Sequence, residues 1–200
     1  MKRNLFYCLV LTSILLSACA PSVTPEPPTP VPPTTEPTAA EPIATSAPAA
    51  LQLTSDAFEH DGPIPSKYAC GGEDVSPALT WSEPPAGTQS FALIMDDPDA
   101  GSTPFVHWVI FNIPASTRGL PEAVPTEDTL PDGSINGRTS RFSTGYMGPC
   151  PPGGVHHYRF HIYALDAMLD LESGTGKGDL LIAMEGHILA EGELIGTYTQ

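Results

Sequence analysis

Two carboxylates and an imidazole stand at the ends of two apolar runs, where they could share one site. Asp97 and Asp99 follow the apolar run 91–95, and His107 lies near the start of the run 105–113. Apolar runs of this length, joined by a turn-forming segment, are typical of strands. Because a polar side chain on a buried strand needs a partner, Asp97 is a ready partner for His107. The spacing predicts a polar pocket on a β scaffold.

A second group of candidate residues follows the Gly- and Pro-rich loop 148–154, GPCPPGG. His156 and Tyr158 come directly after this loop. Backbone N–H groups in such a loop can hold an anion, and a neighbouring imidazole can donate to the same anion. Asp97 would attract an ammonium or hydroxyl group. Together, the two groups describe a site for a small zwitterion or a phosphate ester.

The same residues also have simpler explanations. Asp97-Pro98-Asp99 is a turn signal, with carboxylates that can bond their own backbone, and a lone histidine inside an apolar run is often a core residue. We favour the turn for Asp99 and the site for Asp97 and His107.

Other chemistries lack their motifs. His157 and His161 are too far apart on a predicted strand to chelate one ion easily, and the sequence has neither HExxH nor CxxC. Gly-x-Ser-x-Gly is also absent. We therefore expect no metal, no cofactor and no catalytic residue.

Short strands and many turns must position these candidates. We expect strands over 51–58, 91–95, 105–113, 157–165 and 193–198, and Tyr158 lies on an apolar face of the fourth. A helix is expected over 179–190, with Asp179 as its N-cap and Gly192 as its stop. This pattern predicts a mainly β fold, an antiparallel β-sandwich with Greek-key connections and one or few peripheral helices.

The first 50 residues differ from the rest. Residues 1–18 have the basic start, the apolar run and the small residues of an export signal, and Leu16-Ser17-Ala18-Cys19 resembles a bacterial lipobox. Cys19 would then be acylated, and the alternative is a plain secretory signal. Residues 19–50 are rich in Pro, Thr and Ala and predict a disordered tether. The expected protein is extracytoplasmic and lipid-anchored to a bacterial membrane, with a folded domain over 51–200.

Charge and cysteine content narrow the possible functions. The whole chain has a formal net charge of −15, with 8 Lys and Arg against 23 Asp and Glu, so nucleic acid is an improbable partner. The predicted domain keeps two cysteines, Cys70 and Cys150. In an exported domain they could form a disulfide, and two buried free thiols are the alternative.

Four blocks of the sequence stand out together: Asp97-Pro98-Asp99-Ala100, His107-Trp108-Val109, Gly148-Pro149-Cys150-Pro151-Pro152-Gly153 and His156-His157-Tyr158. They resemble the signature blocks of the phosphatidylethanolamine-binding protein family, in particular its bacterial Raf-kinase-inhibitor-like branch. The segments 75–81, 85–88 and 183–187 also look like that branch, and the resemblance extends over 58–198.

The resemblance implies a β-sandwich with a cavity for phosphate, phosphorylethanolamine-like compounds or other small anions. The positions that match the family's pocket are Asp97, His107, His156 and Tyr158, with Pro151 and the Gly148 loop at the rim. Gly153 and His157 stand where members of the family often have Lys and Arg, which lowers the positive charge expected around the pocket.

These observations predict a membrane-tethered module that binds a small anionic or zwitterionic ligand. An inhibitor of an exported protease, acting through its surface on a protein partner, is the alternative. An enzyme that hydrolyses a phosphate ester would use the same residues as acid and base, and is the least favoured because no activated nucleophile is evident.

Overall fold

Four long antiparallel strands form the centre of the fold. In the order in which they pair, they are β10 (Ile188–Thr199), β9 (Val155–Leu165), β5 (Ser90–Asp97) and β6 (Phe105–Pro114). A computed structural model describes residues 48–200. The predicted signal, Cys19 and all but the end of the tether lie outside the described residues.

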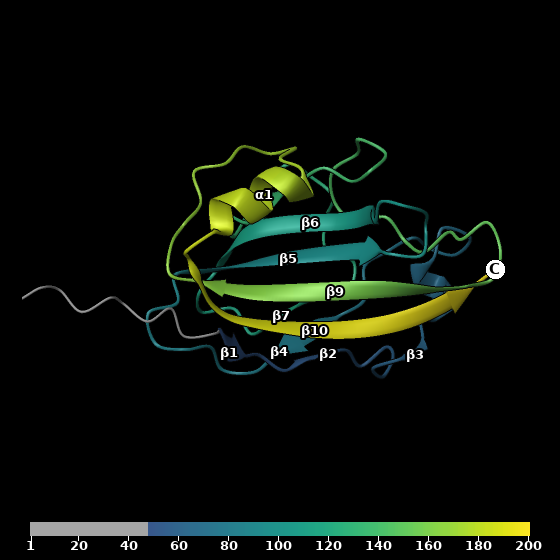
Figure 1. Cartoon of the computed structure of the whole chain (residues 1–200), viewed down its shortest axis with the longest axis horizontal. Helices are drawn as coiled ribbons and strands as arrows, with labels where there is room; N and C mark the ends of the chain where they lie inside the picture. Colours follow the sequence, from purple (N-terminus) through teal and green to yellow (C-terminus); the bar gives the residue numbers. More distant parts are fainter. Residues whose placement is uncertain (1–47) are drawn as a thin grey trace, which may run out of the picture. The chain divides into compact units, whose positions relative to one another are not determined.

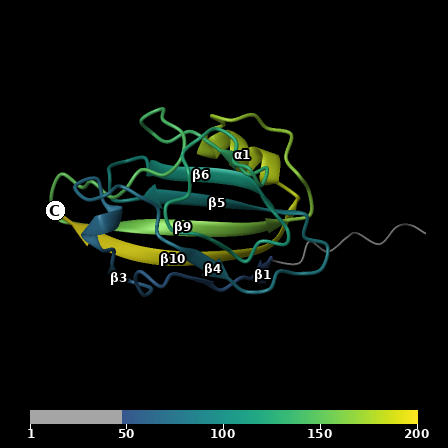
Figure 2. The same cartoon turned by 180° about the vertical axis from the view of Figure 1, so that it is seen from behind.

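Shorter elements complete this sheet and cover its two faces (Figure 1). β1 (Ala49–Ala50) and β3 (Gly62–Pro63) pair with β10 in parallel, and β8 (Ile135–Asn136) pairs with β6. A second sheet comprises β2 (Leu53–Thr54), β4 (Leu79–Trp81) and β7 (Gly119–Leu120). The view from behind in Figure 2 shows β4 across β10. The helical elements are the 3-10 turn η1 (Ser66–Tyr68) and α1 (Lys177–Met184).

Alternation along β5 divides the core into two layers. Phe91, Leu93 and Met95 pack with the residues of the small sheet, whereas Ala92 and Ile94 pack with α1. All eight residues of β5 are buried, because both faces of this strand are covered. The architecture is the mainly β fold with one α-helix that the sequence predicts.

Two predicted elements differ in extent from those observed. The helix expected over 179–190 ends at Met184, and Gly186, with φ of 80°, turns the chain into β10. Its N-cap is Gly176 rather than Asp179. The strand expected over 51–58 is limited to β2, because the Ser55 hydroxyl bonds the Ala78 carbonyl and the Ala57 amide and turns the chain away. Among residues 48–200, no helix has the length and apolarity that crossing a membrane requires.

Candidate functional site

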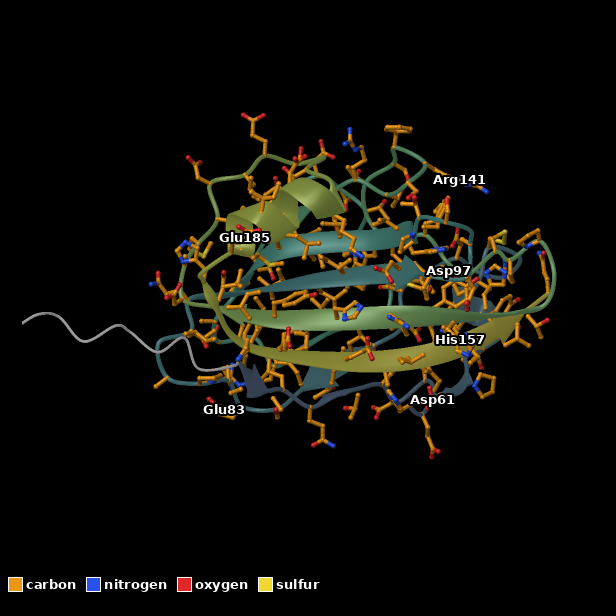
Figure 3. All side chains as sticks on the ribbon, viewed as in Figure 1. Asp61, Glu83, Asp97, Arg141, His157 and Glu185 are labelled. Carbon is orange, nitrogen blue, oxygen red and sulfur yellow. A yellow bond between two sulfur atoms is a disulfide. The ribbon has the colours of Figure 1, made fainter. Side chains whose placement is uncertain are left out.

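A cavity of about 600 Å³ opens where β5 ends and where β6 and β9 begin. Figure 3 shows Asp97 at the end of β5 and Arg141 at the same end of the sheet. The residues that line the cavity come from these strand ends and from the loops around them: Cys70, Asp74, Asp97, Asp99, Ala100, Gly101, Phe105, His107, Arg141, Met147, Cys150, Pro151, Pro152 and His156.

The alternation of β5 sends its last two side chains to opposite faces. Asp96 turns to the face of α1, where its carboxylate pairs with Lys177. Asp97 turns to the other face and lines the cavity. Both carboxylates are at least 97% buried, so each needs the partners that the fold provides.

His107 reaches the cavity because of a β-bulge. Trp108 pairs with Met95 and Val106 pairs with Asp96, so His107 has no partner of its own on β5. A bulge inserts one residue into a strand and redirects the neighbouring side chains. The His107 ring therefore lies against the Tyr158 ring in a T-shaped arrangement, with a centroid separation of 5.1 Å.

A buried carboxylate–imidazole pair links β5 to β9. The Oδ2 of Asp97 accepts a hydrogen bond of 2.7 Å from His156 Nδ1, and its Oδ1 accepts one of 2.8 Å from the Asp99 amide. Because Nδ1 of His156 donates to Asp97, its Nε2 is left for a ligand. Asp97 thus holds His156 in one orientation. The sequence predicted His107 as the partner of Asp97, whereas His107 bonds the Met147 carbonyl instead.

Burial lowers the pKa of His107, and the hydrogen bond to Met147 opposes that shift only in part. His107 Nδ1 donates to the Met147 carbonyl at 2.8 Å. The side chain is neutral at neutral pH, so its Nε2 is a hydrogen-bond acceptor. A ligand group at this nitrogen must either donate a hydrogen bond to it or favour protonation of the imidazole.

Tyr158 lies behind the cavity and is not one of the residues that line it. It is fully buried, and its hydroxyl has no hydrogen-bond partner within the described chain. Desolvation, followed by the negative charge of Asp97, raises the pKa of Tyr158. The phenol is therefore a protonated donor beside the Asp97–His156 pair.

The Gly- and Pro-rich loop forms one wall, but not in the way predicted. Pro151 lines the cavity, whereas Gly148 does not, and the Gly148 amide donates to Asp74 Oδ1 at 2.7 Å. The Gly148 amide is thus engaged within the protein, and anion binding by the other amides of this loop stays a prediction. Cys70 and Cys150 form a disulfide that is part of this wall, with a Cα–Cα distance of 5.5 Å.

Asp99 also lines the cavity, in addition to forming the predicted turn. Its Oδ2 accepts hydrogen bonds from the backbone amide and from Nδ1 of His157, at 2.8 and 2.7 Å. These bonds lower the pKa of Asp99. The carboxylate is therefore ionised and anchors the start of β9.

Sequence reasoning missed two charged residues of the wall, Asp74 and Arg141. Both lie in irregular segments, so neither has a periodic context that would mark it. The one signal in the sequence that could have indicated Arg141 is the small number of cations. With only 8 Lys and Arg residues in the chain, each could have been considered in turn as a partner for an anion. No cluster of three potential metal ligands is present in residues 48–200.

Known proteins are similar in sequence to this chain over almost the whole described region. The family model for phosphatidylethanolamine-binding protein matches residues 54–199. The UPF0098 protein of Methanothermobacter thermautotrophicus is 54% identical over 148 residues, which cover 74% of this chain and 98% of that protein. The UPF0098 protein of Chlamydia muridarum is 41% identical over 155 residues, covering 75% and 99%.

Solved structures of similar fold lead to the same family. A homologue of phosphatidylethanolamine-binding protein from Chlamydia trachomatis superposes with a TM-score of 0.70 at 39% identity, covering 76% of this chain and 98% of that one. E. coli YbcL, described as a new member of the mammalian family, gives a TM-score of 0.71 at 32% identity, covering 76% and 99%. The chain belongs to the phosphatidylethanolamine-binding protein family.

Proposed function

We propose that the protein is a membrane-tethered, extracytoplasmic module that binds a small anionic or zwitterionic ligand, of the phosphate or phosphorylethanolamine type, in this cavity. Cys19 would carry the lipid anchor and residues 19–50 would be the tether. Within the cavity, imidazole nitrogens and Arg141 meet the phosphate, and the carboxylates attract an ammonium group.

The observation that carries the proposal is the convergence of buried polar groups on one concave surface. Asp97, His107 and His156 are each at least 91% buried, yet all three line a cavity of about 600 Å³. A cavity of this size with a few convergent polar groups is typical of small-molecule sites. Polar groups this deeply buried are costly unless they serve a partner or a ligand.

We propose binding rather than catalysis. Among the residues that line the cavity there is no serine, threonine, lysine or free thiol, since Cys70 and Cys150 are bonded to each other. A carboxylate can also attack a phosphate ester. Asp74, Asp97 and Asp99, however, each already accept a hydrogen bond from the protein.

Calorimetric titration of the full chain with phosphorylethanolamine and with inorganic phosphate tests the proposal. We expect saturable binding, together with NMR shifts of the imidazole signals of His107 and His156. Asp97→Asn should weaken binding about tenfold or more, which corresponds to about 1.4 kcal/mol. The exposed Asp170→Asn is the matched control, because it removes the same charge away from the cavity. Absence of heat and of imidazole shifts in the unmodified chain, with these compounds and with vesicles of phosphatidylethanolamine in phosphatidylcholine, would refute the proposed function.

A further inference from the structure

Arg141 is a cation placed at the cavity without a carboxylate partner. No described carboxylate forms a salt bridge with it, and it is one of the residues that line the cavity. Figure 3 shows it at the same end of the sheet as Asp97. Most of the other Lys and Arg residues of the described chain are engaged: Lys67 by Glu122, Arg118 by Glu83, Lys177 by Asp96, and Arg138 by the Phe142 ring.

A tightly bonded turn fixes the backbone of Arg141. Within the turn, the Thr139 amide donates to the Ser143 carbonyl at 2.8 Å, and the Arg141 amide donates to the Thr139 hydroxyl at 3.2 Å. Ser140 ties the turn to β6, because its amide donates to the Val106 carbonyl at 2.9 Å and its hydroxyl accepts from the Val106 amide at 2.8 Å.

The next residue shows that this turn is held against a conformational cost. Phe142 has φ of 64°, the left-handed region that bulky side chains rarely adopt, and its side chain is 79% exposed. Such a conformation persists where the surrounding structure determines it, and it is found preferentially at ligand sites. Phe142 thus contributes a cation–π contact to Arg138 but nothing to the core, and the turn keeps Arg141 at the cavity.

The other charges of the wall give Arg141 a distinct task. The lining residues include the carboxylates of Asp74, Asp97 and Asp99, and His107 is neutral because of its burial. In the described wall, Arg141 is the one Lys or Arg side chain. A planar guanidinium matches the oxygens of a phosphate in two parallel hydrogen bonds. An acidic cavity without this side chain would repel a phosphate.

We propose that Arg141 is the residue that selects a phosphate-bearing ligand in this cavity, by holding its phosphate oxygens from the 139–143 turn. The inference rests on the proposed function and deepens it. It also accounts for how the site tolerates Gly153 and His157 at the places where positive charge was expected. The phosphate can be that of a soluble ester or of a lipid headgroup.

Titration of the full chain and of Arg141→Gln with phosphorylethanolamine, inorganic phosphate and ethanolamine tests the assignment. Arg141→Gln should weaken both phosphate ligands about tenfold or more and leave ethanolamine within about twofold, because one charged hydrogen-bond pair is lost. Arg141→Lys should recover part of the loss. Arg159→Gln is the matched control. It removes the same charge, and Arg159 is exposed on β9 and outside the cavity.

The outcomes separate the two proposals. If the unmodified chain binds none of the three compounds, nor vesicles of phosphatidylethanolamine in phosphatidylcholine, the proposed function fails. If the unmodified chain binds but Arg141→Gln and Arg159→Gln weaken phosphate equally, or not at all, the assignment of Arg141 fails. Binding to vesicles alone, lost in Arg141→Gln, supports the assignment and identifies a lipid headgroup. Equal thermal unfolding of the variants excludes a folding defect.

Discussion

Replacing the buried His107 should change how the stability of the protein depends on pH. Burial lowers the pKa of His107 below its ordinary value of 6.5. Between the folded and unfolded pKa values the unfolded chain binds the extra proton. The free energy of unfolding therefore rises with pH in this window, and the stability is fully present above about 6.5 and lost as pH falls through the window. One group contributes a slope of at most about 1.4 kcal/mol per pH unit.

His107→Asn removes this titration and keeps an N–H near the position that donates to the Met147 carbonyl. Urea unfolding of both proteins between about pH 5 and 8 gives the free energy of unfolding at each pH. We expect the difference between the two proteins to shift in favour of His107→Asn as pH falls below about 6.5. His161, whose pKa burial also lowers, contributes equally to both proteins and cancels in the difference. Parallel curves, or an NMR titration that places the pKa of His107 above 6.5, would contradict the reasoning.

Three further changes test the wall and its protonation. Gly148→Ala should lower the free energy of unfolding by about 1–3 kcal/mol, because a Cβ there would lie 2.2 Å from a backbone oxygen. The control is Gly71→Ala, whose Cβ would meet nothing within 4 Å, and it should change the free energy of unfolding by no more than about 0.5 kcal/mol. Reduction should lower stability by about 4.5 kcal/mol, since the disulfide closes a loop of 80 residues, and a Cys70→Ser/Cys150→Ser double variant should not respond to reductant in the same urea assay. Phosphate binding should take up protons near pH 6.5, because an anion favours the charged form of His107. Calorimetry in buffers of different ionisation enthalpy measures this uptake. Because phosphate also titrates in this range, the difference in uptake between the unmodified chain and His107→Asn isolates the histidine, and equal uptake by both would show that His107 stays neutral.

Alternation in the sequence predicted β9 well because one face of this strand is buried and the other is largely exposed. The run 157–165 is observed within β9, and Tyr158 is buried as its face implied. The fold and the family were also predicted correctly, on motifs that lie at strand ends and tight loops. Asp97, His107 and His156 do meet at one cavity. Binding of a ligand, lipidation of Cys19 and any protein partner stay predictions.

The features that were missed depend on backbone detail or on distant loops. The bulge at His107 shifts the register by one residue, and no periodicity records such an insertion. Asp74 and Arg141 come from segments without a pattern, and the fold alone brings them to the wall. The helix was extended too far because residues 188 and 189 continue its apolar stripe, although Gly186 had already ended it.

The cavity combines two kinds of support, and these predict different responses to mutation. Asp97 and His156 stand on long strands and are hydrogen-bonded to each other inside the core, so removing either should reduce both affinity and stability. Arg141 stands on an exposed turn, so its removal should reduce affinity alone. Reduction of the disulfide should lower the stability more than the affinity. The Cys70 amide also donates to the Pro149 carbonyl at 3.0 Å, and this hydrogen bond would hold the two loops together after reduction. A plot of the affinity of each variant against its free energy of unfolding would therefore separate residues that bind the ligand from residues that build the site. If all variants fell on one line, the affinity would depend only on the stability of the fold.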